Sequence, residues 1–184
     1  MSHPGTDAHA PRAIDPNRFA GAEILQSSFP NDDGTIAPPL AAALEAYAVD
    51  RSTFPEVIAA LAPTRLLVPV VAVLGEVEYD EKGLAHDKSS DMATVLVTGA
   101  DGRQALIAFT STESLHRWNP EARPVPVPAP VAAQSAVQEE AAALVVDIAG
   151  PVPFVIQGND LEPFAAGWEL VRVGERTGWL RPAE

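Results

Sequence analysis

Cysteine is absent from the 184-residue chain, which excludes a disulfide framework, a thiolate metal site and a cysteine nucleophile. Basic residues are scarce as well: 12 lysines and arginines stand against 25 aspartates and glutamates, a formal net charge of −13. Such an acidic chain opposes the electrostatic attraction that dominates nucleic-acid binding, and it also disfavours anionic membranes. We therefore expect neither nucleic acid nor a membrane as its partner.

Long apolar runs are also missing. The longest, residues 66–74, is far below the roughly 20 residues that a membrane-spanning helix needs, and Pro69 interrupts it. The first residues contain no basic start followed by an apolar stretch, so they do not look like a secretory signal. The lack of cysteine is compatible with a reducing compartment, and we expect a cytoplasmic protein.

The sequence lacks the motifs of the common enzyme classes. There is no Gly-x-Ser-x-Gly elbow for a serine hydrolase, and neither Gly-x-Gly-x-x-Gly nor Gly-x-x-x-x-Gly-Lys for phosphate binding. Of the four histidines only His86 and His116 lie inside the expected domain, and no His-x-x-x-His spacing occurs. We expect no catalytic residue, no metal and no cofactor, so the chain is not expected to be an enzyme.

What the sequence does contain indicates one globular domain. The hydrophobic share is 47% with only 6% aromatics, which predicts an aliphatic, closely packed core. The length suits a single domain. We predict a flexible tail over residues 1–17, a domain over residues 18–166, and a C-terminal extension over residues 167–184 that forms a strand or a hairpin.

The first half of the domain predicts two helices and a strand. After Pro38-Pro39, apolar residues at helical spacing predict a short helix. Thr53 and Glu56 have the spacing of a capping box and predict a second helix, which Pro63 ends. The apolar run from residue 65 to 74 follows as a buried strand, with a bulge at Pro69.

A hairpin and a third helix come next. Two β-prone runs, residues 92–98 and 104–109, flank an Asp-Gly turn signal. Directly after them, Thr110 and Glu113 repeat the capping-box spacing at the start of a helix that ends at Asn119-Pro120. We expect Glu113 to fill the capping role, which would repel an anion at this helix end.

Proline then occupies every second position from Pro124 to Pro130, which fits an edge strand or a polyproline connector. The remaining pattern consists of a helix over 131–143, a strand over 144–148, an extended piece over 154–157 and a short helix around Leu161. Strands that alternate with helices predict an α/β fold, with α+β as the alternative. We expect a mixed β-sheet of about five to seven strands with helices packed on it, in a single layered domain.

The order of these elements resembles the SseB-type (enhanced serine sensitivity) N-terminal domain. The segments that carry the likeness are the loop of residues 87–92, Ala-Phe-Thr-Ser-Thr-Glu-Ser-Leu at 108–115, Ala-Arg-Pro-Val-Pro-Val at 122–127, and Leu-Val-Val-Asp-Ile-Ala-Gly-Pro at 144–151. The resemblance spans residues 18–166. Its motifs are packing and capping elements, so it implies a family and a fold but no reaction and no ligand.

The loop before the hairpin is the candidate binding site. Lys88 is one of only two lysines, and it stands among polar residues directly before the hairpin. We predict that this loop contacts a ligand or partner; the alternative is a salt-bridged structural lysine. The candidate residues are Asp87, Lys88, Ser89, Ser90 and Asp91.

Three kinds of function remain open. The first is a non-catalytic interaction module that binds another protein through the sheet edge at residues 124–130, or through apolar surface that includes Trp168 and Trp179. The second is a small-molecule sensor with a pocket beside the hairpin, linked to amino-acid metabolism because the family name suggests serine. An enzyme of unknown class is the third. The partner, the ligand and the oligomeric state are not fixed by the sequence.

Overall fold

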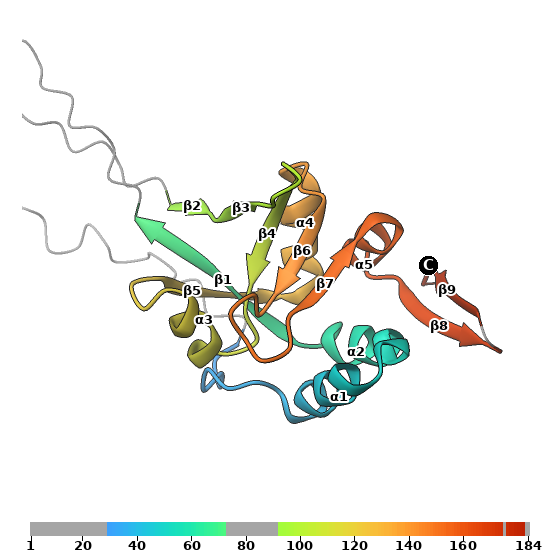
Figure 1. Ribbon diagram of the computed structural model, residues 1–184. Coiled ribbons are helices and arrows are strands. Elements are labelled where there is room, and N and C mark those ends of the chain that lie inside the picture. Colours follow the sequence, from blue (N-terminus) through green and yellow to red (C-terminus); the bar gives the residue numbers. More distant parts are fainter. Residues whose placement is uncertain (1–28, 73–91, 175, 183–184) are drawn as a thin grey trace, which may run out of the picture. The chain divides into compact units, whose positions relative to one another are not determined.

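The computed structural model describes residues 29–72, 92–174 and 176–182 (Figure 1). The chain divides into two compact units, Met1–Pro30 and Asn31–Glu184, and every helix and strand below belongs to the second. Within the described ranges, no helix has the length and apolar character needed to cross a membrane.

The structure alternates helices and strands, so the prediction of a mixed α/β fold is confirmed. The helices are α1 (Pro38–Val49), η1 (Arg51–Thr53), α2 (Phe54–Leu61), α3 (Thr112–Trp118), α4 (Ala129–Gln138), η2 (Gly158–Asp160) and α5 (Leu161–Ala165). The strands are β1 (Arg65–Ala72), β2 (Met92–Thr94), β3 (Leu96–Thr98), β4 (Gln104–Ala108), β5 (Arg123–Pro128), β6 (Ala143–Val146), β7 (Phe154–Gln157), β8 (Glu169–Val173) and β9 (Arg176–Leu180).

The strands form three small sheets rather than the expected single sheet of five to seven strands. Their orders are β2-β1-β5, β3-β4-β6-β7 and β8-β9. In the four-stranded sheet β4 and β6 run parallel while the outer pairs are antiparallel, so this sheet is mixed. One isolated bridge, between Leu67 and Phe109, joins the two larger sheets. The sheet is divided because the strand expected over 92–98 changes partner at Val95: β2 pairs with β1, and β3 pairs with β4.

The predicted hairpin is therefore correct for β3 and β4 and wrong for residues 92–94. Its turn contains Gly102 at φ 79°, a conformation that glycine adopts without strain. Of the two alternatives predicted for the proline-rich segment, the edge strand is the one observed: among the described strands, β5 pairs with β1 alone.

The bulge predicted at Pro69 is wrong. The register of β1 with β5 runs without interruption from the pair Arg65–Pro128 to the pair Val70–Arg123. Leu67 exchanges both its N–H and its C=O bonds with Phe109, so Leu67 turns its backbone groups away from β5. The backbone groups at Pro69, two residues further on, also point away from β5. The N–H that proline lacks would not have bonded to β5, so the β1–β5 ladder loses no hydrogen bond.

The predicted helices are confirmed in position, but the first capping box is not formed. Thr53 makes no side-chain cap bond to α2, and its Oγ1 is directed at the carbonyl of Asp50, to which it donates at 2.8 Å. The Asp50 carboxylate caps η1 by accepting from the N–H of Ser52. The helix predicted over 131–143 is shorter than expected, since α4 ends at Gln138 and Glu140 lies at φ 55°.

The larger hydrophobic core lies between one face of the four-stranded sheet and the helices. It includes Leu106 and Leu144 of the parallel strands together with buried residues of α1, α2, α4 and α5. Phe154 of β7 stacks on Phe54 and meets Tyr47 edge-on, each at 5.1 Å between ring centroids. This packing fixes α1 beside the end of the sheet where the parallel strands finish.

A smaller core lies on the other face, around Ile107, Phe109 and Leu115. Trp118 of α3 packs on Phe109 with ring centroids 5.6 Å apart. Because α3 follows β4 after only three residues, this contact holds the start of α3 against the carboxyl end of β4.

Candidate functional site

The loop that the sequence singled out, with Asp87, Lys88, Ser89, Ser90 and Asp91, lies outside the described residues. Its proposed contact with a ligand or partner stays a prediction. The described part of the chain offers a different candidate, a groove at the carboxyl ends of the parallel strands β4 and β6.

The groove has a volume of about 250 Å³ and lies between α1, the start of α3 and the loop after β6. The carboxyl ends of parallel strands are where ligands generally bind in α/β sheets. The lining residues are Ile36, Ala41, Leu44, Glu45, Thr110, Ser111, Glu113, Ser114, Arg117, Asp147, Pro151 and Val152.

Asp147 is the buried carboxylate of the groove, with 6% of its surface exposed. It follows β6 directly, and its oxygens accept from the N–H of Thr110 at 2.9 Å and from the Thr110 hydroxyl at 2.6 Å. Its backbone lies at φ 54°, a left-handed conformation that aspartate tolerates better than most residues. The turn at Asp147 thus ties the end of β6 to the segment that follows β4.

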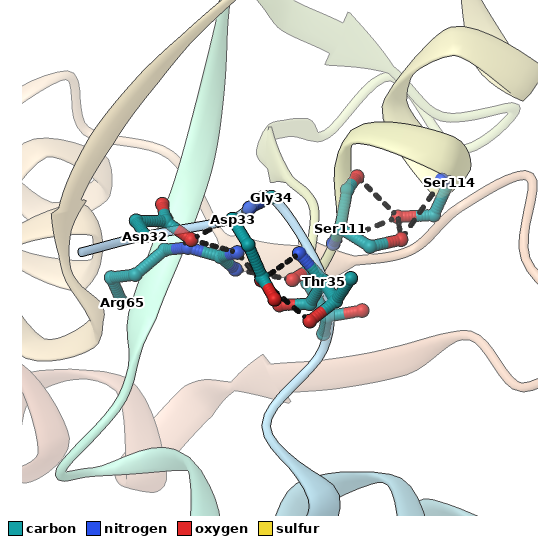
Figure 2. Close-up of polar contacts among 8 residues, drawn as sticks. Asp32, Asp33, Gly34, Thr35, Arg65, Ser111 and Ser114 are labelled. Atoms are coloured by element: carbon teal, nitrogen blue, oxygen red, sulfur yellow. Dashed lines mark hydrogen bonds and ion pairs between the residues drawn. The ribbon is translucent and has the colours of Figure 1, made fainter.

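Arg65 continues this polar connection and lies beside Asp32 in Figure 2. Its guanidinium donates two hydrogen bonds of 2.7 Å to the Asp32 carboxylate, a bidentate ion pair. It also donates to the carbonyl of Thr35 at 2.8 Å and to the carbonyl of Thr110. The guanidinium therefore joins β1, the segment before α1 and the end of β4 at one point.

The ion pair is shielded from water, since the Arg65 side chain is 9% exposed and that of Asp32 is 18% exposed. Hydrogen bonding from Arg65 lowers the pKa of Asp32 below its ordinary value of 3.8, and the N–H of Gly34 contributes in the same direction. The Asp32 carboxylate is thus held in its charged form, as the bidentate geometry requires.

The segment that carries Asp32 also supports α3. The carbonyl of Gly34 accepts from the N–H of Thr112, the first residue of that helix, at 2.8 Å. Gly34 lies at φ 80°, and a Cβ built on it would lie 2.5 Å from the Thr112 Oγ1. Glycine is needed at this position because both the backbone conformation and the space exclude a side chain.

The cap of α3 is displaced by one residue from the prediction (Figure 2). Ser111, not Thr110, is the N-cap, and it forms a capping box with Ser114. The Thr110 hydroxyl is directed at Asp147, to which it donates, and the Ser111 Oγ instead accepts from the N–H of Ser114. Glu113 is therefore not a cap; its carboxylate accepts from Arg117 at 2.8 Å on the rim of the groove.

The charges around the groove are unequal. Among the lining residues that the structure describes, Glu45 of α1, Glu113 of α3 and Asp147 contribute three carboxylates, whereas Arg117 is the one cationic side chain. The guanidinium of Arg117 is already paired with Glu113. The apolar side chains of the lining, here called the floor of the groove, include the buried Leu44.

Other predicted features lie away from the groove. His116 is exposed on α3. Trp168 and Trp179 are half-buried rather than parts of an exposed apolar surface, and Trp179 packs against the larger core and donates from Nε1 to Asp160 at 2.9 Å. Among the residues that the structure describes, no group of acidic or histidine side chains is arranged to hold a metal ion.

A second hollow, of about 330 Å³, lies on the face of the four-stranded sheet opposite the larger core. Small apolar side chains of neighbouring strands line it, including Val97, Ala105, Val145 and Val155. Asp101 and Arg103 form an exposed ion pair beside it. Because this lining carries a balanced pair of charges, it offers less chemical selectivity than the acidic groove.

Sequence reasoning missed Arg65 and Asp147. Asp147 had a signal, since an acidic residue directly after a buried apolar strand commonly lies at the carboxyl edge of a sheet. Arg65 had none, because nothing in the sequence pairs it with Asp32, which is 33 positions away.

Fold and groove together define a mixed α/β domain with an acid-lined groove at the ends of two parallel strands. The family model of the SseB protein N-terminal domain matches residues 40–163, more than half of the chain. The chain therefore belongs to the SseB N-terminal domain family, as its sequence motifs predicted. Searches of the curated proteins and of the solved structures gave no match.

Proposed function

We propose that this chain is a non-catalytic binding module that holds a basic, partly apolar segment of another protein in the groove beside α1 and α3. The observation that carries the proposal is that the described lining combines an apolar floor with three carboxylates against one guanidinium. Glu113 already pairs with that guanidinium, and the exposed carboxylate of Glu45 has no partner among the described residues. A lysine or arginine side chain matches it, because its aliphatic stem suits the floor and its cationic head suits the carboxylates.

The acidity of the whole chain supports the same partner. A formal net charge of −13 steers basic molecules toward the surface and raises their association rate at low salt. The groove then selects among them by shape, since its volume of about 250 Å³ accommodates one or two side chains rather than a large cofactor.

A non-catalytic role is supported by the way the polar groups of the groove are occupied. Asp147 accepts from both donors of Thr110, Ser111 and Ser114 bond to each other, and Glu113 is paired with Arg117. A catalytic base or nucleophile needs a partner that activates it rather than one that fixes the fold. The cytoplasmic location and the role of the Lys88 loop stay predictions.

A small molecule that carries an ammonium group is the second candidate. It is favoured by the position of the groove at the carboxyl ends of two parallel strands, where α/β proteins commonly bind small ligands. An amino-acid sensor would belong to this class.

The test is the affinity of a labelled basic peptide, Leu-Lys-Leu-Arg-Leu, measured by fluorescence anisotropy against its counterpart with glutamate at both basic positions. We expect the basic peptide alone to bind. Glu45→Lys, on the exposed rim, should weaken binding about tenfold, whereas Glu121→Lys, exposed and outside the groove lining, adds the same charge and should retain most of the affinity.

The outcomes separate the two candidates. Equal weakening by both variants would show that only net charge matters and would contradict the groove. If the peptide fails to bind, but free L-serine or L-lysine raises the melting temperature of the wild type and not of Glu45→Lys, the site is that of a sensor. No response to the peptide or to either amino acid would refute both.

A further inference from the structure

The outer strand β5 is rich in proline, and this affects which other strands can pair with its sheet. Residues Arg123–Pro128 read Arg-Pro-Val-Pro-Val-Pro, so prolines alternate with other residues along the strand. Among the described strands β5 pairs with β1 alone, which makes its other side an edge of the described sheet. Whether that edge can pair with another strand depends on which residues turn their backbone groups outward.

Two sets of hydrogen bonds fix the direction of the backbone groups. Leu67 of β1 exchanges both of its backbone bonds with Phe109, at 2.8 and 2.9 Å, so the pair Leu67–Pro126 makes no bond across the β1–β5 ladder. The N–H of Ala129 donates to the carbonyl of Thr64 at 3.0 Å, which continues the ladder at the alternate positions. Because bonded and non-bonded pairs alternate in an antiparallel ladder, the backbone N–H and C=O groups of Val125 and Val127 point toward β1.

By the same alternation, the backbone groups of Pro124, Pro126 and Pro128 point away from β1, toward the outer edge. Each of these residues directs a carbonyl away from β1, and none has an N–H beside it. Pro124 and Pro128 are exposed, and Pro126 is partly exposed. The outer edge of β5 therefore offers hydrogen-bond acceptors and no donors, while the side that faces β1 keeps its donors.

We infer that β5 is a closed edge, at which the three outward prolines prevent the addition of a strand from a second copy of this chain or from another protein. An added strand would find no N–H to accept from, and half of the bonds of a normal ladder would be missing. A partner that binds through an extended segment must use a surface other than β5. This inference does not depend on the groove.

The test restores the missing donors. In the variant Pro124→Thr, Pro126→Thr and Pro128→Thr, three N–H groups appear on the outer edge and threonine favours the strand conformation. The matched control, Pro120→Thr, Pro130→Thr and Pro153→Thr, removes three prolines outside β5. We expect the edge variant to self-associate with rising concentration in sedimentation velocity, toward twice the mass of the wild-type species, and the control to sediment as the wild type does.

Amide hydrogen exchange at the new residues makes the test independent of partial unfolding. At low concentration the N–H groups at positions 124, 126 and 128 should exchange rapidly while those of Val125 and Val127 are protected; on self-association the first three should become protected. The inference is wrong if these three amides are protected at low concentration, because they would then bond within the chain. It is also wrong if the variant keeps this exchange pattern and still sediments as the wild type at every concentration.

Discussion

Replacing Arg65 tests the polar connection that holds the groove together. Arg65→Ala removes the bidentate pair with Asp32 and the bonds to the carbonyls of Thr35 and Thr110. Loss of one partner from a buried ion pair costs about 3–5 kcal/mol, and because the Asp32 side chain retains 18% exposure we expect about 3 kcal/mol. Arg65→Lys keeps the charge but not the fork geometry, so it should cost about 1–2 kcal/mol.

The assay is urea unfolding followed by circular dichroism, with Arg103→Ala as the control. Arg103 pairs with Asp101 at 2.6 Å, but their side chains are 63% and 53% exposed, so its loss should cost less than about 0.5 kcal/mol. The double variant Arg65→Ala, Asp32→Asn should lose clearly less unfolding free energy than the two single variants lose in sum. If the unfolding free energy of Arg65→Ala lies within about 0.5 kcal/mol of that of Arg103→Ala, the role assigned to the Arg65–Asp32 pair is wrong.

Three further results are expected. Gly34→Ala should destabilise the fold by about 2 kcal/mol in the same urea assay, because the backbone at φ 80° and the 2.5 Å approach of a Cβ to Thr112 both oppose it; an unchanged midpoint would contradict this. The lowered pKa of Asp32 contributes stability that is present above its ordinary value of 3.8 and is lost as the pH falls through the lowered value, so unfolding free energy should drop less steeply with acid in Asp32→Asn than in the wild type. Trp179→Phe should cost about 1 kcal/mol in thermal unfolding, since it removes the hydrogen bond to Asp160 and keeps most of the ring packing; no loss would mean that this hydrogen bond adds nothing to the stability of the domain.

Local signals in the sequence predicted most of the elements. Helical spacing after Pro38-Pro39 and the Asp-Gly signal at 101–102 act within a few residues, and the structure has α1 and the β3–β4 turn at those places. The alternate prolines indicated an edge strand for the same reason, because a missing N–H restricts a residue wherever it stands.

Features that depend on distant residues could not be predicted. The cap of α3 is Ser111 rather than Thr110, whose hydroxyl is directed at Asp147, 37 positions away. The separation of the two larger sheets depends on the change of strand partner at Val95, since β2 pairs with β1 and β3 with β4. The groove itself arises from the parallel pairing of β4 with β6, which no local pattern specifies.

The central claim is that the groove between α1 and α3 is the binding surface of this domain. An amide NMR titration with the peptide Leu-Lys-Leu-Arg-Leu tests it most directly, because each shifted signal reports the location of contact. We predict that the largest shifts fall on groove residues such as Leu44, Ser114 and Val152, and that Glu45→Lys needs about tenfold more peptide to reach them. Shifts that instead fall on the hollow lined by Val97 and Val155, or that persist unchanged in Glu45→Lys, would contradict the claim.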